Sequence, residues 1–141
     1  MEKILLVKEG LKKCYGMWNL PAGSVENFEK ITDGAIRETL EETGLKVKLT
    51  GVLPIGQRII NDKTFISVRF IAEIVEGEIV YDNEEIIDIK WFSIEEIQAL
   101  NENTLRSYEF NKQAINNYIN NIIYPIAIFD DKQYIDEQKN N

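Results

Sequence analysis

Residues 23–45 read GSVENFEKITDGAIRETLEETGL, and this stretch passes from an irregular opening to a helical pattern within a few residues. From about Glu29 to Thr43 apolar residues recur at helical spacing. Gly44 follows where a left-handed residue ends many helices. Gly34 lies inside the pattern, where glycine destabilises a helix by about 1 kcal/mol relative to alanine. We expect that glycine is needed there because the helix packs closely against a strand. We therefore predict a helix over residues 29–43 with an inward face of Ile31, Ala35, Ile36, Thr39 and Leu40.

Three glutamates of this helix, Glu38, Glu41 and Glu42, are spaced at i, i+3 and i+4, so their side chains leave one face. Like charges at this spacing repel one another, and negative charge near a helix C-terminus opposes the helix dipole. Divalent cations would relieve both penalties, because carboxylate oxygens are the ligands that Mg²⁺ prefers. Arg37 stands four residues before Glu41 and can orient a carboxylate. Considered alone, the cluster has a solvated acidic helix face as its commonest explanation, with metal binding as the alternative.

Strand-like segments and two further helices surround residues 23–45. The run KILLVK predicts a buried strand over Lys3–Lys8. Residues 18–23 cannot be helical, because Pro21 lacks an amide donor. Ser93 and Glu96 form a capping-box pattern that opens a short helix. Further strands are predicted over 46–55, 64–75, 78–81 and 86–92, and a last helix over 108–122 with an apolar stripe of Phe110, Ala114, Ile115, Tyr118, Ile119 and Ile122.

The order of these elements predicts an α/β (α+β) fold in which a mixed β-sheet is sandwiched between helices. We expect one domain over residues 1–129. Residues 130–141 are polar, lack apolar periodicity and are predicted to form a flexible tail.

Composition narrows the possible functions. The chain of 141 residues has a formal net charge of −8, which disfavours binding to a nucleic-acid polymer. It contains no histidine, which excludes serine–histidine and cysteine–histidine mechanisms and imidazole ligands. Cys14 is the only cysteine, so no internal disulfide can form. Without a long apolar run or a secretory signal pattern, we expect no membrane partner and a cytoplasmic location.

The glycine at 23, the glutamate at 29 and the run RETLEETGL at 37–45 together resemble the signature of the Nudix (MutT-like) hydrolase family. Thr39 is the single departure, because the family usually has an aliphatic residue there, but its methyl group can still pack. The lead-in WNLPAG over 18–23 and the corner WFS over 91–93 are also similar to the family. The resemblance implies the Nudix fold and hydrolysis of a diphosphate linked to another group, with Mg²⁺ or Mn²⁺ as cofactor.

The resemblance also implies roles for individual residues. Glu38, Glu41 and Glu42 would bind the metal, and the carbonyl of Gly23 would face it. Arg37 would orient the acidic cluster, and Glu29 would pair with the helix or with a metal-bound water. Glu85, with Glu84 and Asp82 as alternatives, would supply a further carboxylate from the segment before Trp91. Either Glu41 or Glu85 would act as general base towards the attacking water.

The substrate would be a small nucleotide or another pyrophosphate compound, and the sequence does not choose among these. Candidate substrate contacts are Arg58 and Arg69 for phosphates and Trp18 and Phe70 for a base. The segment LRS over 105–107 and the lead-in resemble a branch of phosphatases acting on nucleoside tri- and diphosphates and on thiamine-pyrimidine pyrophosphate. The alternative function is a Nudix-fold regulatory module that binds a nucleotide without hydrolysing it. Such modules typically lose glutamates that this chain retains.

Family members usually carry an additional strand before the one predicted over Lys3–Lys8. The sequence begins too late for that strand, so we expect an exposed sheet edge or a partner subunit that covers it. Either a monomer or a homodimer is compatible with the sequence.

Overall fold

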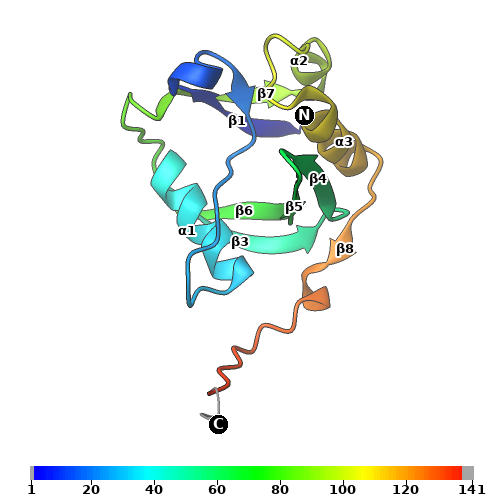
Figure 1. Ribbon diagram of the computed structural model, residues 1–141. Coiled ribbons are helices and arrows are strands. Elements are labelled where there is room, and N and C mark those ends of the chain that lie inside the picture. The colour runs from blue at the N-terminus through cyan, green and yellow to red at the C-terminus, as the bar shows by residue number, and fades with distance from the viewer. Residues whose placement is uncertain (1, 138–141) are drawn as a thin grey trace.

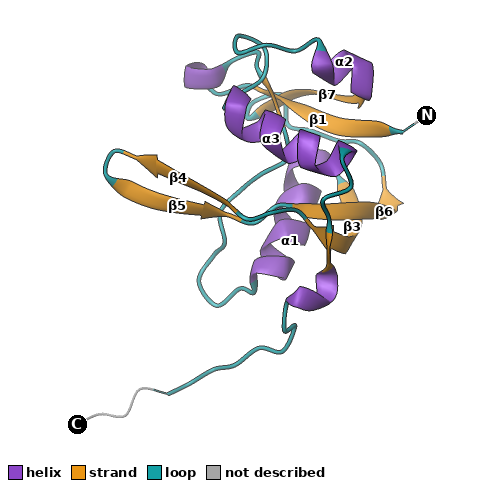
Figure 2. Ribbon diagram, turned by 90° about the vertical axis from the view of Figure 1, so that its right-hand side faces the viewer, coloured by secondary structure: helices purple, strands orange, loops and turns teal. Residues whose placement is uncertain are grey.

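The computed structural model describes residues 2–137, whose strands form three antiparallel sheets (Figure 1). In the first, β1 (Lys3–Glu9) lies between β2 (Trp18–Asn19) and β7 (Ile86–Ser93). In the second, β3 (Leu45–Val52) lies between β6 (Phe70–Gly77) and β8 (Tyr124–Pro125). In the third, β4 (Gly56–Ile60) and β5 (Lys63–Ser67) form a hairpin that projects from the body in Figure 2.

The helices lie against these sheets. α1 (Ile31–Thr43) packs against β3, and α2 (Ile94–Gln98) follows β7 directly. α3 (Tyr108–Ile119) lies below β1 in Figure 2. Two 3₁₀ turns complete the described part of the chain, η1 (Lys12–Cys14) and η2 (Ile126–Ile128). No helix among the described residues is both long and apolar enough to cross a membrane.

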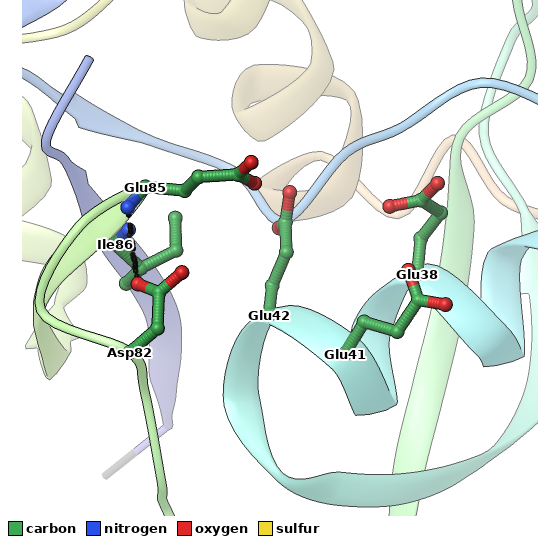
Figure 3. Close-up of a pocket in the computed structure, with 6 residues that line it drawn as sticks. All are labelled: Glu38, Glu41, Glu42, Asp82, Glu85 and Ile86. Atoms are coloured by element: carbon green, nitrogen blue, oxygen red, sulfur yellow. Dashed lines mark hydrogen bonds between the residues drawn. The ribbon is translucent and has the colours of Figure 1, made fainter.

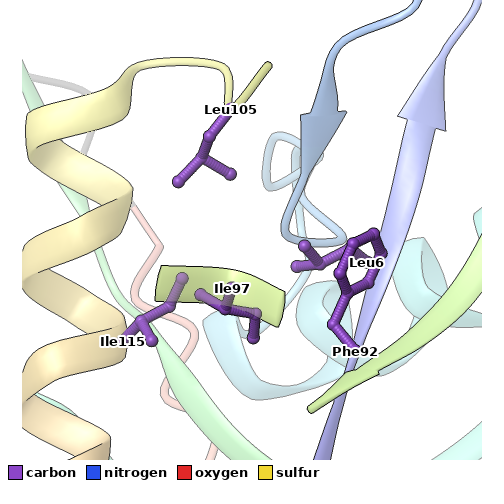
Figure 4. Close-up of a cluster of buried hydrophobic side chains, with 5 residues drawn as sticks. All are labelled: Leu6, Phe92, Ile97, Leu105 and Ile115. Carbon is purple, nitrogen blue, oxygen red and sulfur yellow. The ribbon is translucent and has the colours of Figure 1, made fainter. Parts of the chain in front are cut away.

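A buried apolar cluster joins the first sheet to α2 and α3 (Figure 4). It draws one side chain from each of five segments: Leu6, Phe92, Ile97, Leu105 and Ile115. The Trp18 ring packs edge-on against Phe92, with ring centroids 4.8 Å apart. Each of these buried side chains contributes roughly 1.5–3 kcal/mol to stability, and together they hold the first sheet against α2 and α3.

The predicted α+β fold class is confirmed, and the structure adds that the strands pair antiparallel, with one isolated parallel bridge between Trp18 and Leu105. The predicted strands over Lys3–Lys8 and 86–92 and the capping box of Ser93 are also confirmed. The hydroxyl of Ser93 accepts from the Glu96 amide at 3.1 Å, and the Glu96 carboxylate accepts from the Ser93 amide at 2.9 Å.

Several predicted boundaries were wrong. The strand predicted over 46–55 ends at Val52, shortly before Pro54. The strand predicted over 64–75 is two strands, β5 and β6. β5 pairs with β4 through a turn at Asn61 and Asp62, which both have positive φ, as a two-residue hairpin turn requires. Residues 78–81 form no strand and instead run past the end of α1, where the Val80 amide donates to the Thr43 carbonyl at 2.9 Å.

The helix faces also differ from the prediction. α1 begins at Ile31 rather than at Glu29, and Ile31 and Leu40 are exposed, whereas Gly34 and Thr43 are its buried residues. In α3, Ala114 and Ile115 are buried as predicted, but Ile119 is exposed. Residues 130–137 of the predicted tail have no regular secondary structure, although Lys30 pairs with Asp131 at 3.0 Å; residues 138–141 lie outside the described residues.

Candidate active site

Arg37 is the centre of the ion-pair network on α1. Its Nε and Nη2 donate to both carboxylate oxygens of Glu29, at 2.7 and 3.0 Å. Its Nη1 donates to Glu38 at 2.9 Å and to Glu41 at 3.1 Å. The pairing holds the pKa of Glu29 below its ordinary value, chiefly through the Arg37 hydrogen bonds, and raises that of Arg37. Arg37 therefore orients three carboxylates, and Glu29 pairs with the helix.

Two glycines allow the loop before α1 to approach this network. A side chain at Gly23 would overlap the Glu38 carboxyl group and would force that carboxylate to move. A methyl group at Gly34 would lie 2.9 Å from Glu29 Oε1 and close to Val25. The prediction that Gly34 packs against a strand was therefore wrong, since it makes room for the Glu29 carboxylate.

Glu42 differs from the other glutamates of α1 in having no basic partner among the described residues. Its carboxylate accepts from the Ala22 amide at 3.1 Å. Burial, and then the charges of Glu9, Glu38 and Glu85, raise the pKa of Glu42 to about 8. A cation bound beside Glu42 would stabilise its ionised form and lower its pKa again.

Five carboxylates line one pocket of about 70 Å³ (Figure 3): Glu38, Glu41, Glu42, Asp82 and Glu85. In Figure 3 the carboxylates of Glu42 and Glu85 point towards one another, from α1 and from the loop before β7. The volume corresponds to roughly two water molecules, so the pocket suits ions and water and is too small for a nucleotide. The rest of a bound substrate must lie outside it.

The loop before β7 is built around Asp82. Its Oδ1 accepts from the amides of Glu84, Glu85 and Ile86 at 2.9, 3.0 and 3.1 Å. These hydrogen bonds hold the pKa of Asp82 below its ordinary value. The Glu85 carbonyl in turn accepts from the Gly10 amide at 2.8 Å. Asp82 thus fixes the loop, while Glu85 extends into the pocket and Glu84 does not line it.

The donor set suits Mg²⁺ or Mn²⁺, since clustered carboxylates supply the hard oxygen ligands that these cations prefer. In the present side-chain conformations, no three acidic, histidine or cysteine residues among those described converge on one point. The reason is that Arg37 holds Glu38 and Glu41. Glu41 is 58% exposed and can turn towards Glu42. The site therefore fits a divalent cation once these carboxylates rotate away from Arg37.

The residues predicted to contact substrate lie elsewhere. Trp18 packs on the buried cluster, and the Phe70 ring lies 5.4 Å from that of Phe129. Arg58 and Arg69 meet at Phe110 in the first turn of α3. None of these four residues lines the carboxylate pocket, and their contact with substrate stays a prediction.

Sequence reasoning missed Glu9, which is only 7% exposed at the end of β1. Its Oε1 accepts from Asn19 at 2.9 Å and from Arg106 at 3.1 Å. Asn111 completes this buried network by donating to Asn19 Oδ1 at 2.9 Å. The Glu9 charge acts on Glu42, so the network borders the site. The only local signal was an acid at the end of an apolar strand.

Comparison with known proteins defines the class of this chain. The family model of the NUDIX domain matches residues 1–114. The chain therefore belongs to the Nudix family.

Individual relatives agree with this assignment. The chain is 39% identical over 100 residues to Nudix hydrolase 6 of Arabidopsis thaliana, a match covering 67% of this chain and 35% of that protein. It is 32% identical over 131 residues to Phosphatase NudJ of Escherichia coli O1:K1, covering 92% and 83%. A solved NUDIX hydrolase from Nitrosomonas europaea superimposes with a TM-score of 0.80 at 31% identity, covering 94% and 88%. The chain spans about a third of the Arabidopsis protein and most of the other two.

Proposed function

We propose that this chain hydrolyses a diphosphate linkage in a nucleoside di- or triphosphate, or in a related pyrophosphate compound, with Mg²⁺ as cofactor. The observation that carries the proposal is Glu42, a partly buried carboxylate that has no basic partner among the described residues and faces Glu85 in a pocket of five acids. Such a pocket binds divalent cations, and phosphate substrates are electrostatically excluded from it without them. The names of the relatives, Nudix hydrolase 6 and Phosphatase NudJ, support the reaction class.

Glu42, Glu38 and Glu41 would hold the metal, together with the Gly23 carbonyl. When bound, Mg²⁺ supplies charge neutralisation for the phosphate oxygens and lowers the pKa of a water molecule. Arg37 sets the rotamers of Glu38 and Glu41 before the cation binds. Its bidentate contact with Glu29 keeps the guanidinium beside α1 when those two carboxylates turn away.

We assign the general-base role to Glu85 rather than to Glu41. Glu41 is already assigned as a metal ligand, so its carboxylate is committed to the cation. Glu85 has no ion pair with the described residues, and its side chain extends into the pocket from a loop that Asp82 and Gly10 fix. A base on a fixed loop opposite the metal ligands can accept a proton from a water between the two elements.

The likeness of the lead-in over 18–23 and of the segment LRS over 105–107 to one phosphatase branch leads us to propose a nucleoside di- or triphosphate, or thiamine-pyrimidine pyrophosphate, as substrate. The name of Phosphatase NudJ, a near full-length match, supports the phosphatase class alone. The test is a panel of these compounds with ADP-ribose and dinucleoside polyphosphates, assayed for phosphate and pyrophosphate release. We expect turnover with Mg²⁺ or Mn²⁺ that a chelator abolishes.

Three variants test the residue assignments. Glu42→Gln and Glu85→Gln should each lower kcat by about 10²–10⁴-fold, whereas Glu84→Gln, the matched control on the same loop, should retain full activity. The rise in melting temperature on addition of Mn²⁺ is a measure of metal binding that does not depend on turnover, and this rise should be smaller in Glu42→Gln. Full activity of Glu42→Gln would refute the proposed site. Nucleotide binding without turnover by the unmodified chain would favour the regulatory-module alternative.

A further inference from the structure

Arg58 of β4 and Arg69, next to the start of β6, converge on one aromatic ring. The guanidinium carbon of each lies 4.4 Å from the centroid of the Phe110 ring, in the first turn of α3. Gly56 places the β4 backbone directly against this group, because a methyl group there would overlap the Phe110 ring and lie 2.9 Å from Arg69 Nη2. The cluster is therefore packed into the junction of three elements, and neither arginine is a loose surface side chain.

Neither guanidinium has an acidic partner. The chain has four arginines and 24 acidic residues, and the other two arginines, Arg37 and Arg106, are both ion-paired. Among the described residues, no carboxylate forms an ion pair with Arg58 or Arg69. The Nε atoms of both are buried and lack a hydrogen-bond partner there. In a molecule of net charge −8, the two guanidiniums thus form a local cationic site that no carboxylate of residues 2–137 neutralises by an ion pair.

The partners that these arginines do have are neutral. Arg69 donates to the carbonyls of Phe110 at 3.0 Å and Pro54 at 3.1 Å. Arg58 donates through Nη1 to the hydroxyl of Ser107 at 3.1 Å, and its Nη2 makes no hydrogen bond to a described residue. Burial and the charge of Arg58 lower the pKa of Arg69. Two like charges are thus held together by packing and neutral acceptors.

The N-terminus of α3 adds to the positive potential. Ser107 is the N-cap residue, but its side chain does not cap the helix, since the hydroxyl accepts from Arg58. The first turn of this 12-residue helix carries one acidic residue, the exposed Glu109, which forms no ion pair with either guanidinium, and it presents the positive end of the helix dipole beside them. Arginine forks match phosphate oxygens bidentately and retain that geometry when stacked on an aromatic ring.

We propose that Arg58, Arg69 and the Phe110 end of α3 form a phosphate-binding site outside the carboxylate pocket. Arg58 is the residue that engages the anion, because it has a free Nη2, while Arg69 supplies charge and holds the site together. The phosphate group can come from two sources, a distal phosphate of the substrate or free inorganic phosphate. Only the first source rests on the proposed hydrolytic function.

The test uses the full chain, from which metal has been removed on an immobilised chelator. A soluble chelator is avoided because it is itself an anion and would compete with phosphate for the arginines. Inorganic phosphate is titrated into ¹⁵N-labelled protein, and amide shifts of residues 107–111 are followed. We expect saturable shifts that Arg58→Gln weakens by about tenfold or more. Lys63→Gln, which removes one positive charge from the exposed tip of the same hairpin, should bind as the unmodified chain does. Arg69→Lys should also weaken binding, provided that its melting temperature shows a folded chain.

Absence of saturable shifts in the unmodified chain would overturn the proposal, as would equal affinity in Arg58→Gln. Steady-state kinetics then separate the two sources. A substrate phosphate predicts a rise of about tenfold in KM for Arg58→Gln at unchanged kcat, with phosphate as a competitive inhibitor. Free phosphate predicts an unchanged KM and a phosphate-dependent kcat that Arg58→Gln removes. Because the titration requires no turnover, failure of hydrolysis leaves its result intact.

Discussion

Replacing Glu42 with glutamine should stabilise the metal-free chain at neutral and basic pH while removing its activity. The carboxyl group is partly buried among other acids, and its pKa is raised from the ordinary value of 4.5 to about 8. Between these values the folded state binds more protons than the unfolded state. The free energy of unfolding must therefore fall as pH rises through this window, by at most about 1.4 kcal/mol per pH unit. Below pH 4.5 both states are protonated and Glu42 contributes no slope.

Between pH 4.5 and pH 7 the free energy of unfolding falls by about 3 kcal/mol on account of Glu42. This is an upper value, because the pocket opens to water, which screens the charges. Glutamine carries no charge at any of these pH values, and its side-chain oxygen can still accept from the Ala22 amide. We therefore expect Glu42→Gln to exceed the unmodified chain in stability at pH 8, and the two to converge near pH 4.5.

The assay is urea unfolding followed by circular dichroism from pH 5 to 8, with metal removed. Glu29, Asp82 and Asp130 have lowered pKa values, so their own contribution to stability is lost only as pH falls towards the ordinary values of 4.5 and 3.8, and it has the opposite sign to that of Glu42. Glu41→Gln is the matched control, because Glu41 is paired with Arg37 and no gain is expected. Equal stability of Glu42→Gln and the unmodified chain at pH 8 would refute the reasoning. Added Mg²⁺ should restore stability to the unmodified chain alone.

Three further substitutions test the geometry. Gly23→Ala places a methyl group on the Glu38 carboxyl, and we expect kcat/KM to fall by about 100-fold with little change in melting temperature. Phe28 is 95% exposed with a φ of 64°, so Phe28→Gly should raise the free energy of unfolding by about 0.5–1 kcal/mol, and a decrease would contradict the strain. Ser93→Ala removes the α2 cap and should lower it by about 1 kcal/mol in urea, whereas no loss would mean that the cap is dispensable.

The local part of the site could be predicted from sequence because it depends on helical spacing. Glu38, Glu41 and Glu42 share a face wherever a helix forms, and Arg37 four residues before Glu41 meets it on that face. Gly44 ends the helix with a φ of 77°, as its position predicted. The arrangement of these three glutamates and Arg37 therefore follows from the local sequence of α1.

The remaining features depend on long-range packing. The buried partners of Glu9 lie at Asn19 and Arg106, which no local pattern connects. Ile31 and Leu40 have helical spacing but are exposed, whereas Gly34 and Thr43 are the buried residues of α1, so the buried face of the helix is not the one that carries its largest apolar side chains. The β4–β5 hairpin did carry a signal, the pair Asn61–Asp62, which tolerates positive φ.

Asp82 has a consequence for anyone who wishes to redesign this chain. Its single oxygen anchors three successive amides, the last of which belongs to Ile86, the first residue of β7. Asp82 therefore fixes both the position of Glu85 and the start of β7. Inserting a residue between Asp82 and Ile86 would break this set of hydrogen bonds and displace the Glu85 carboxylate, while the apolar pattern of β7 would still favour its present register on β1. Loop length here is not a free variable for engineering, and variants of this loop must keep the spacing from Asp82 to Ile86.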